Sequence, residues 1–352
     1  MDDLKVGLIG WGSSATTFHA PLIRATPGLQ LAAVATRSPT SAAAAVRAAC
    51  GDAVTVQSAE ALIADGRLDL IVVATPNDSH HALADAALRA GRHVVVDKPF
   101  ALDTSQARSL VARAGEVDRL LCVFHNRRWD GDFMTLRSLL DRGVLGRPVE
   151  FVSHFDRYRP QVRDRWREHA GAGNGLWFDL GPHLLDQTLQ LFGAPAAITL
   201  DLALQRDGAL TDDWFCCHLR WEGGPHDGLR ARLQAGMLAA EAGPRFLVHG
   251  HAGSLRIDGL DPQESALKRG ADPADPGWGQ ESTRRGRWWL GDGPPDSVPL
   301  LAGAYPSFYA GMRDAIRGLG PLPVALDAAL AVQALLDAGR RSVAARAELR
   351  LA

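Results

Sequence analysis

The chain has 352 residues, of which 46% are hydrophobic and 22% are charged, and its formal net charge is −2 at pH 7. This length exceeds what a single hydrophobic core usually serves, so we expect two domains. The composition is ordinary for a globular protein, and the near-neutral charge gives no electrostatic reason to expect nucleic acid or an anionic membrane as a partner.

The cysteines, the histidines and the first residues predict a cytoplasmic protein without a metal site. The acidic start Met1-Asp2-Asp3 runs straight into an apolar segment, unlike a signal peptide, and no apolar run is long enough to cross a bilayer. The four cysteines show no Cys-x-x-Cys spacing, which favours a reducing compartment and no structural disulfide. The 12 histidines show no metal-ligand spacing.

A glycine-rich turn follows the first predicted strand, residues 5–9. Its sequence Gly10-Trp-Gly-Ser-Ser-Ala15 matches G-x-G-x-x-A, the strand-to-helix turn that binds the pyrophosphate of a dinucleotide. In this pattern Gly10 allows the tight turn, Gly12 lets the backbone approach the phosphates, and Ala15 permits close packing of helix on strand. We therefore expect the turn to bind the cofactor through Gly10, Gly12, Ser13, Ser14 and Ala15.

Strands and helices then alternate with short connections. The predicted strands cover residues 30–35, 54–56, 68–74, 93–96 and 120–124, and the predicted helices cover 41–49, 59–64 and 81–90. This order is typical of an α/β domain with a doubly wound parallel sheet. A methyltransferase also has a glycine-rich first turn, but the G-x-G-x-x-A spacing and a later Lys-Pro element favour a dinucleotide-binding protein.

The end of the second predicted strand bears on the choice between NAD and NADP. NAD enzymes commonly place Asp or Glu there, whereas this chain has Thr36-Arg37-Ser38. A guanidinium flanked by hydroxyl groups suits the 2′-phosphate, so we expect Thr36 and Arg37 to bind NADP in preference to NAD. The alternative is that Arg37 is a solvated turn residue.

Polar residues also follow the strand at 68–74. At such a strand end they can line the ribose and nicotinamide of the cofactor. A plain helix N-terminus capped by Asp78 or Ser79 explains the same segment equally well. The candidates for cofactor binding here are Thr75, Pro76, Asn77 and His80.

The segment Asp97-Lys98-Pro99-Phe100 follows the apolar run 93–96, which is typical of a buried parallel strand. Ligands bind outside the carboxyl ends of strands in open α/β sheets, so Lys98 points toward a ligand site. A solvated surface lysine is the alternative, and the position at a strand end makes it the weaker one.

A possible proton-transfer pair lies in the second half of the chain. Pro182 can occupy the first position of a helix that runs to Leu191 and stops at Gly193. Asp179 would then lie just before this helix and His183 in its first turn. Oxidation of an alcohol needs a base, and a carboxylate can orient a histidine that serves as one. The alternative is that Asp179 only caps the helix and His183 only packs.

The remainder indicates a second domain, so we place a dinucleotide-binding domain at 1–124 and an α+β domain at 125–352. Alternating stretches at 151–155, 214–221, 230–233 and 245–249 are typical of antiparallel strands with one exposed face. Gly, Pro and Asp dominate 270–299, which predicts a long loop, with Trp278 either over the pocket or simply packed. Helical spacing at 329–339 predicts a packed helix.

Together, Gly10-x-Gly12-x-x-Ala15, Asp97-Lys98-Pro99 and Asp179-x-x-x-His183 resemble the Gfo/Idh/MocA oxidoreductase family along the whole chain. Segments 124–130, 154–160 and 163–168 resemble its branch of NADP-dependent scyllo-inositol 2-dehydrogenases. The resemblance implies an N-terminal Rossmann domain, a C-terminal α+β domain with a large, open, mostly antiparallel sheet, and a homodimer or homotetramer.

The resemblance also implies roles for individual residues. Lys98 would bridge cofactor and substrate, His183 would be the general acid/base, and Asp179 would orient it. Trp166 and Arg167 resemble a pair that contacts the nicotinamide in related sugar reductases. Asp97, which the resemblance places among the cofactor-binding residues, departs from the common Glu-Lys-Pro form by one methylene, which puts the role of its carboxylate in doubt.

These features predict an NADP-dependent oxidoreductase that acts on a secondary alcohol of a cyclic polyol or sugar, first of all scyllo-inositol. A reductase of another sugar ketone or aldehyde is the alternative among enzymes. A noncatalytic NADP-binding regulator is the alternative outside them, although it would need no proton-transfer pair. Besides His183, the candidates for contact with substrate hydroxyls are Arg127, Tyr158 and Arg165, with Arg128 and Arg159 as neighbours.

Overall fold

The computed structural model describes residues 2–281 and 283–351, which form two compact units. Unit 1 contains the described residues of 1–126, 263–278 and 304–330, and unit 2 contains those of 127–262, 279–303 and 331–352. Unit 1 thus gathers three separate stretches of chain. The domain boundary between residues 124 and 125 stays a prediction.

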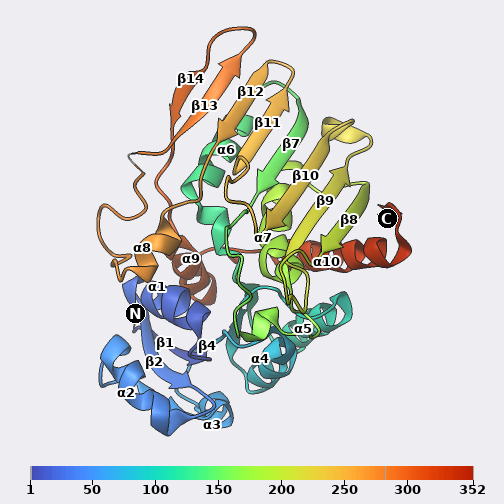
Figure 1. Ribbon diagram of the computed structural model, residues 1–352. Helices are drawn as coiled ribbons and strands as arrows, with labels where there is room; N and C mark the ends of the chain where they lie inside the picture. The colour runs from blue at the N-terminus through green and yellow to red at the C-terminus, as the bar shows by residue number, and fades with distance from the viewer. Residues whose placement is uncertain (1, 282, 352) are drawn as a thin grey trace. The chain divides into compact units, whose positions relative to one another are not determined.

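Unit 1 is built on a six-stranded parallel sheet with the order β3-β2-β1-β4-β5-β6 (Figure 1). This is the Rossmann order, in which the direction of winding reverses beside β1, and it confirms the predicted doubly wound sheet. Ligands of such sheets bind at that reversal, outside the carboxyl ends of the strands. The strands are β1 (Leu4–Ile9), β2 (Leu29–Ala35), β3 (Thr55–Gln57), β4 (Leu70–Val73), β5 (His93–Val96) and β6 (Leu121–Val123).

Helices cover this sheet, so its central strands are buried: all four residues of β4 are 0% exposed. Val, Ile and Leu fill these strands because both faces of a parallel sheet are covered. Local capping fixes two helix starts, where Ser58 and Asp103 accept hydrogen bonds from Ala61 N and Gln106 N. The helical segments are η1 (Ala15–His19), α1 (Ala20–Ala25), α2 (Pro39–Cys50), α3 (Ala59–Ala64), η2 (Asn77–Ser79), α4 (His80–Arg89), α5 (Thr104–Glu116), α8 (Gln263–Lys268) and α9 (Pro306–Ile316).

Unit 2 is built on a nine-stranded sheet with the order β14-β13-β12-β11-β7-β10-β9-β8-β15. Neighbouring strands are antiparallel except β7 and β10, which are parallel, so the predicted large and mostly antiparallel sheet is confirmed. The strands are β7 (Pro148–His154), β8 (Ala197–Ala203), β9 (Trp214–Arg220), β10 (Arg230–Gly236), β11 (Phe246–Gly250), β12 (Gly253–Ile257), β13 (Arg285–Leu290), β14 (Asp296–Pro299) and β15 (Leu349–Arg350).

Helices α6 (Gly131–Asp141), α7 (Leu176–Phe192) and the part of α10 (Leu326–Ala345) from residue 331 onward bury a core with this sheet. Trp177 on α7 is 1% exposed, and its indole Nε1 donates a hydrogen bond of 3.2 Å to the Leu336 carbonyl on α10. Phe215 from β9 packs edge-on against its ring. Short helical turns η3 (Asn126–Trp129), η4 (Trp166–Glu168) and η5 (Gly224–His226) complete the chain.

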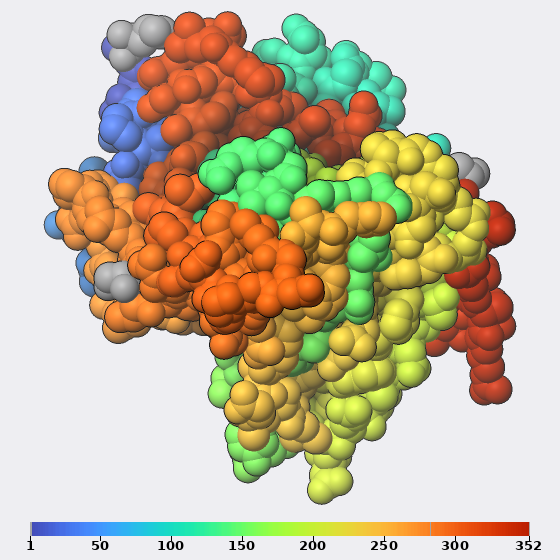
Figure 2. Space-filling model, turned by 90° about the horizontal axis from the view of Figure 1, so that it is seen from above, coloured from blue at the N-terminus to red at the C-terminus, as the bar shows by residue number. Residues whose placement is uncertain are grey.

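The prediction of a long loop at 270–299 is wrong, because two segments of this stretch form β13 and β14. Both lie at one edge of the sheet, where β13 pairs with β12 and β14 pairs with β13. The orange segment of these strands lies beside the golden β11 and β12 in Figure 2. Pairing with a distant strand overrode a turn-like composition here. Trp278 lies in unit 1, where its Nε1 donates to Gln263 Oε1 at 2.9 Å.

Candidate functional site

The glycine-rich turn of unit 1 has the backbone that the sequence predicts. Gly10 has φ +104°, and a Cβ there would lie 2.3 Å from the Ala74 carbonyl oxygen, so only glycine fits. A Cβ on Gly12 would meet no atom within 4 Å. The space in front of Gly12 is therefore open, as a pyrophosphate approaching the backbone requires. Ala15 is fully buried beneath the turn.

The ends of β2 and β3 fit the adenosine half of a dinucleotide. Thr36 Oγ1 and Gln57 Nε2 are buried and have no hydrogen-bond partner among the described residues, although Thr36 N donates to Gln57 O at 3.2 Å. Buried polar atoms are rarely left without a partner in the complete molecule. Arg37 beside them is exposed. These donors suit a ribose with a 2′-phosphate, and Gln57 lies one residue beyond the strand end that the sequence predicts.

The β4 exit is tied to the Lys98-Pro99 segment by His80. This histidine is 0% exposed, with Nδ1 2.9 Å from the Pro99 carbonyl oxygen and Nε2 3.0 Å from the Thr75 carbonyl oxygen. Both contacts go to the backbone, so His80 fixes two strand exits relative to each other. Asn77 beside it is 5% exposed. Cofactor contacts of Thr75, Pro76, Asn77 and His80 stay predictions.

Lys98 lies at the end of β5, half-buried, before a cis peptide bond to Pro99. Its backbone N–H donates to Asp97 Oδ1 at 2.8 Å. Asp97 itself is 4% exposed, and its Oδ2 lies 3.7 Å from Nε2 of the fully buried His19. The carboxylate of Asp97 therefore faces the interior of unit 1, and its predicted cofactor contact stays untested.

In unit 2, Asp179 and His183 both lie on α7, four residues apart and so on one helix face. The prediction that the helix starts at Pro182 is wrong: α7 begins at Leu176, and Pro182 is inside it. The physical reason is distant in sequence. The backbone carbonyl of Asp212 accepts from Leu176 N at 2.8 Å and its carboxylate from Trp177 N at 2.7 Å, so Asp212 caps the helix earlier.

Two guanidinium groups flank the carboxylate of Asp179. Arg157 Nη1 lies 3.9 Å from Oδ2, and Arg167 Nε lies 3.6 Å from Oδ1. Both positive charges favour the ionised carboxylate. His183 is 6% exposed. The pair thus has the ingredients of a general acid/base with an orienting carboxylate.

A pocket of about 330 Å³, counting its solvent-open part, lies beside Asp179 in unit 2. Arg165, Arg167 and Asp179 all line it. Arg206 also lines the pocket. Its side chain is 4% exposed and forms ion pairs with both Glu168 and Asp213. The walls therefore combine charges of both signs, which suits a neutral, hydroxyl-rich ligand better than a strongly charged one.

Comparison with known proteins decides the family. A family model described as "Oxidoreductase family, NAD-binding Rossmann fold" matches residues 4–125, and one described as "Oxidoreductase family, C-terminal alpha/beta domain" matches 137–351; both carry the name GFO_IDH_MocA. The chain belongs to the Gfo/Idh/MocA oxidoreductase family. It is an NAD(P)-dependent dehydrogenase of that family.

Among Gfo/Idh/MocA proteins, the uncharacterized oxidoreductase YdgJ of Escherichia coli is 47% identical over 100% of this chain and 99% of that protein. The scyllo-inositol 2-dehydrogenase (NADP(+)) IolW of Bacillus subtilis is 35% identical over 97% of this chain and 94% of its own. The structure of the oxidoreductase YPO2259 of Yersinia pestis has a TM-score of 0.91 at 45% identity, covering 100% of this chain and 98% of its own.

The other predicted Gfo/Idh/MocA site residues of unit 2 are not all gathered at the pocket. Arg127 is 5% exposed and lies over the Phe155 ring at 4.7 Å, whereas Tyr158 is 62% exposed, and neither lines the pocket. Arg165 lines it with its Nε bonded to Glu168 Oε1 at 2.6 Å. Arg128 makes a bidentate ion pair with Asp186, so its guanidinium is engaged within the protein.

Trp166 and Arg167 are stacked on each other, with the guanidinium 4.4 Å from the ring centroid. The same guanidinium contacts Asp179, so Arg167 is tied to the predicted proton-transfer pair. Contact of Trp166 and Arg167 with a nicotinamide stays a prediction. Sequence reasoning missed Arg157 as a partner of Asp179, although it lies within the quoted segment 154–160.

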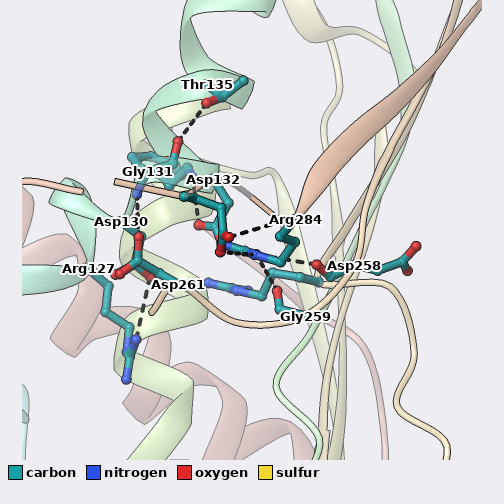
Figure 3. Close-up of polar contacts among 12 residues, drawn as sticks. Arg127, Asp130, Gly131, Asp132, Thr135, Asp258, Gly259, Asp261 and Arg284 are labelled. Atoms are coloured by element: carbon teal, nitrogen blue, oxygen red, sulfur yellow. Dashed lines mark hydrogen bonds and ion pairs between the residues drawn. The ribbon is translucent and has the colours of Figure 1, made fainter. Parts of the chain in front are cut away.

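A cluster of buried charges lies elsewhere in unit 2, at the start of α6 (Figure 3). Asp132 Oδ2 accepts from Arg284 Nη1 at 2.9 Å, and Asp261 Oδ2 accepts from Gly131 N at 2.7 Å. Burial raises the pKa of Asp130 to about 8 against the charge of Arg127, and the nearby Asp261 and Asp132 add to the rise. Within residues 2–281 and 283–351, no cluster of His, Cys, Asp or Glu is arranged to hold a metal.

Proposed function

We propose that this dehydrogenase uses NADP to oxidise a secondary alcohol of a cyclic polyol or sugar to a ketone, with scyllo-inositol as the first candidate substrate and 2-inosose as its product. The similarity to the Bacillus subtilis scyllo-inositol 2-dehydrogenase over nearly the whole chain carries this proposal. The mixed charges of the pocket beside Asp179 support it, because a polyol offers hydroxyl groups and no net charge.

NADP is the proposed cofactor because the β2 and β3 ends offer donors to a 2′-phosphate. Arg37 supplies the charge, and Thr36 Oγ1 and Gln57 Nε2 are buried donors without a partner among the described residues. No carboxylate follows β2 to repel a phosphate. When bound, the nicotinamide supplies the hydride-transfer chemistry. The protein positions the substrate, polarises its reacting oxygen and exchanges the hydroxyl proton.

Lys98 is the proposed electrophile. Its ammonium stabilises the negative charge that develops on the substrate oxygen, and one such preorganised donor is often worth about 3 kcal/mol. The cis peptide bond follows it at once, and the Asp97 carboxylate holds its N–H. This hydrogen bond fixes the backbone from which the lysine side chain starts.

His183 is the proposed base that accepts the hydroxyl proton in oxidation and returns it in reduction. Asp179 on the same helix face orients the imidazole and stabilises its protonated form, and the guanidinium groups of Arg157 and Arg167 flank that carboxylate. We place the enzyme in the cytoplasm. We also propose that it is a homodimer or homotetramer, and light scattering of the purified protein measures this oligomeric state. No helix in the part of the chain that the structure describes is long and apolar enough to span a membrane.

Initial rates of NADPH formation, with NAD in parallel, across scyllo-inositol, myo-inositol and a panel of aldoses test this function. We expect saturable, NADP-dependent activity on scyllo-inositol. Activity on a different sugar alone would replace the substrate while keeping the reaction. Silence across the panel with NADP binding intact would contradict the proposal and favour a noncatalytic NADP-binding protein.

A further inference from the structure

We propose that His19 is a positioning residue for Lys98 that acts through Asp97, within a buried chain that also contains Tyr309. This inference rests on the proposed role of Lys98. All four residues belong to unit 1. They come from separate elements: η1 carries His19, the β5 exit carries Asp97 and Lys98, and α9 carries Tyr309.

The Asp97 carboxylate divides its two oxygens between Lys98 and His19. Oδ1 accepts the Lys98 backbone N–H at 2.8 Å, and Oδ2 lies 3.7 Å from His19 Nε2. The second distance is longer than a hydrogen bond, so this contact is a longer-range attraction between the Nε2 side of the ring and the carboxylate. A rotation of the carboxylate away from His19 would therefore move the oxygen that holds the Lys98 backbone.

Tyr309 fixes the orientation of the His19 ring. Its hydroxyl lies 2.6 Å from His19 Nδ1, and both side chains are 0% exposed. Burial, together with the charge of Asp97 and the thiol of Cys122, raises the pKa of Tyr309, so the phenol keeps its proton and can donate it to Nδ1. The ring hydrogen then lies on Nε2, which faces Asp97.

Aromatic packing holds this arrangement in place. The His19 ring lies 4.3 Å from that of Phe124, and Phe124 packs edge-on against Phe308 at 4.8 Å. His19 Nε2 has no hydrogen-bond partner among the described residues. The imidazole is therefore directed at Asp97 by its surroundings.

Charge balance favours an ionised Asp97 in this setting. Burial by itself raises the pKa of Asp97 and is the largest single influence, but the contact with His19 lowers it. The charge of Lys98 and the hydroxyl of Ser14 act in the same direction, and the pKa is held well below its usual range. Ser14 belongs to the glycine-rich turn, so the carboxylate links that turn to the lysine. The facing groups are thus His19, Lys98 and Ser14, with Tyr309 and Cys122 behind them.

The test follows the Lys98 side chain directly, without relying on turnover. The chain has only three lysines, Lys5, Lys98 and Lys268, so reductive ¹³C-methylation gives few NMR signals. Comparison with Lys98→Arg assigns the Lys98 signal. In the full-length wild-type protein we expect no acid-side inflection of that signal in the ordinary carboxyl range, since Asp97 stays ionised there.

His19→Leu should raise the Asp97 pKa, so the Lys98 signal should gain an acid-side inflection within the ordinary carboxyl range, which the wild type lacks. His19→Gln, which keeps an N–H where Nε2 lies, should restore most of the wild-type titration. Adding Asp97→Asn to His19→Leu should abolish this inflection, because the carboxyl that titrates is gone. Tyr309→Phe should shift the acid-side inflection as His19→Leu does, by less.

An unchanged Lys98 signal in His19→Leu, or an inflection that persists when Asp97→Asn is added, would overturn the inference. If His19→Leu does not fold, Tyr309→Phe decides in its place, and an unchanged titration there contradicts the inference equally. A merely structural role would lower the melting temperature without moving the inflection. If the wild type is inactive on every polyol, the proposed function is wrong, but the titration of the Lys98 signal can still be measured. If turnover is normal and the titration is unchanged in the variants, only the inference about His19 is wrong.

Discussion

The Oδ1 atom of Asp179 lies 3.6 Å from Nε of Arg167, and both residues line the pocket of unit 2. Asp179 also lies one helical turn before His183. The guanidinium is thus placed to act on the proposed proton-transfer pair, whereas the family resemblance assigns it to the nicotinamide. The two roles predict different defects.

Arg167→Met should lower kcat about tenfold, because Asp179 loses a guanidinium group that flanks it and holds His183 less firmly. The dissociation constant of NADPH, measured by fluorescence, should change much less. Arg163→Met is a matched control, since Arg163 is exposed and does not line the pocket. A large loss of NADPH affinity with normal kcat would instead assign Arg167 to the cofactor.

His183→Ala should remove the histidine limb from the pH profile of kcat for alcohol oxidation, because a neutral imidazole is the proposed base. Asp179→Asn should move that limb to lower pH, since the imidazolium loses its carboxylate neighbour and its pKa falls. Initial rates over a range of pH measure both effects. Retention of the wild-type limb by His183→Ala would exclude this residue as the base.

Arg37→Gln should weaken NADPH binding about tenfold or more while leaving NADH binding nearly unchanged, because only NADPH carries the 2′-phosphate. Gln57→Glu should act in the same direction by placing a negative charge beside that phosphate. Fluorescence titration with both nucleotides measures the ratio. Arg47→Gln on the exposed side of α2 serves as the control. An equal loss for both nucleotides would contradict selectivity at this strand end.

Asp130 should make the protein less stable as the pH rises. Its pKa in the folded protein is raised to about 8, so this contribution to the free energy of unfolding is fully present below the ordinary Asp pKa. It is lost as the pH rises toward about 8, by at most about 1.4 kcal/mol per pH unit. Asp130→Asn should therefore raise the melting temperature more at about pH 9 than at about pH 5. Equal shifts at both values, or the same pattern in the exposed control Asp292→Asn, would show that Asp130 keeps an ordinary pKa.

Much of unit 1 could be predicted because its signals are local. The turn at Gly10 and the position of Lys98 follow from a few consecutive residues at strand ends. The continuous apolar runs of the strands indicate that these strands are buried. The His19–Tyr309 contact could not be predicted, because it joins residues 290 apart in sequence. No periodicity or motif carries such a pairing.

In unit 2 the sequence predicts the pair Asp179 and His183 but misplaces the start of their helix. Pro182 is a common first helical residue, which explains the error. Capping by Asp212, 35 residues from Trp177, starts the helix earlier. Likewise β13 and β14 form in a segment rich in turn residues because an existing sheet edge supplies their hydrogen bonds. In both segments, hydrogen bonds to residues distant in sequence determine the secondary structure.

The most direct test of the proposed reaction is the single-turnover rate of NADPH formation from scyllo-inositol, compared between the wild type and Lys98→Met. The wild type should form NADPH, and Lys98→Met should do so about 100-fold or more slowly, since the developing negative charge loses its donor. Lys268→Met, at an exposed lysine, should match the wild type. A wild-type rate in Lys98→Met with NADP still bound would contradict the mechanism.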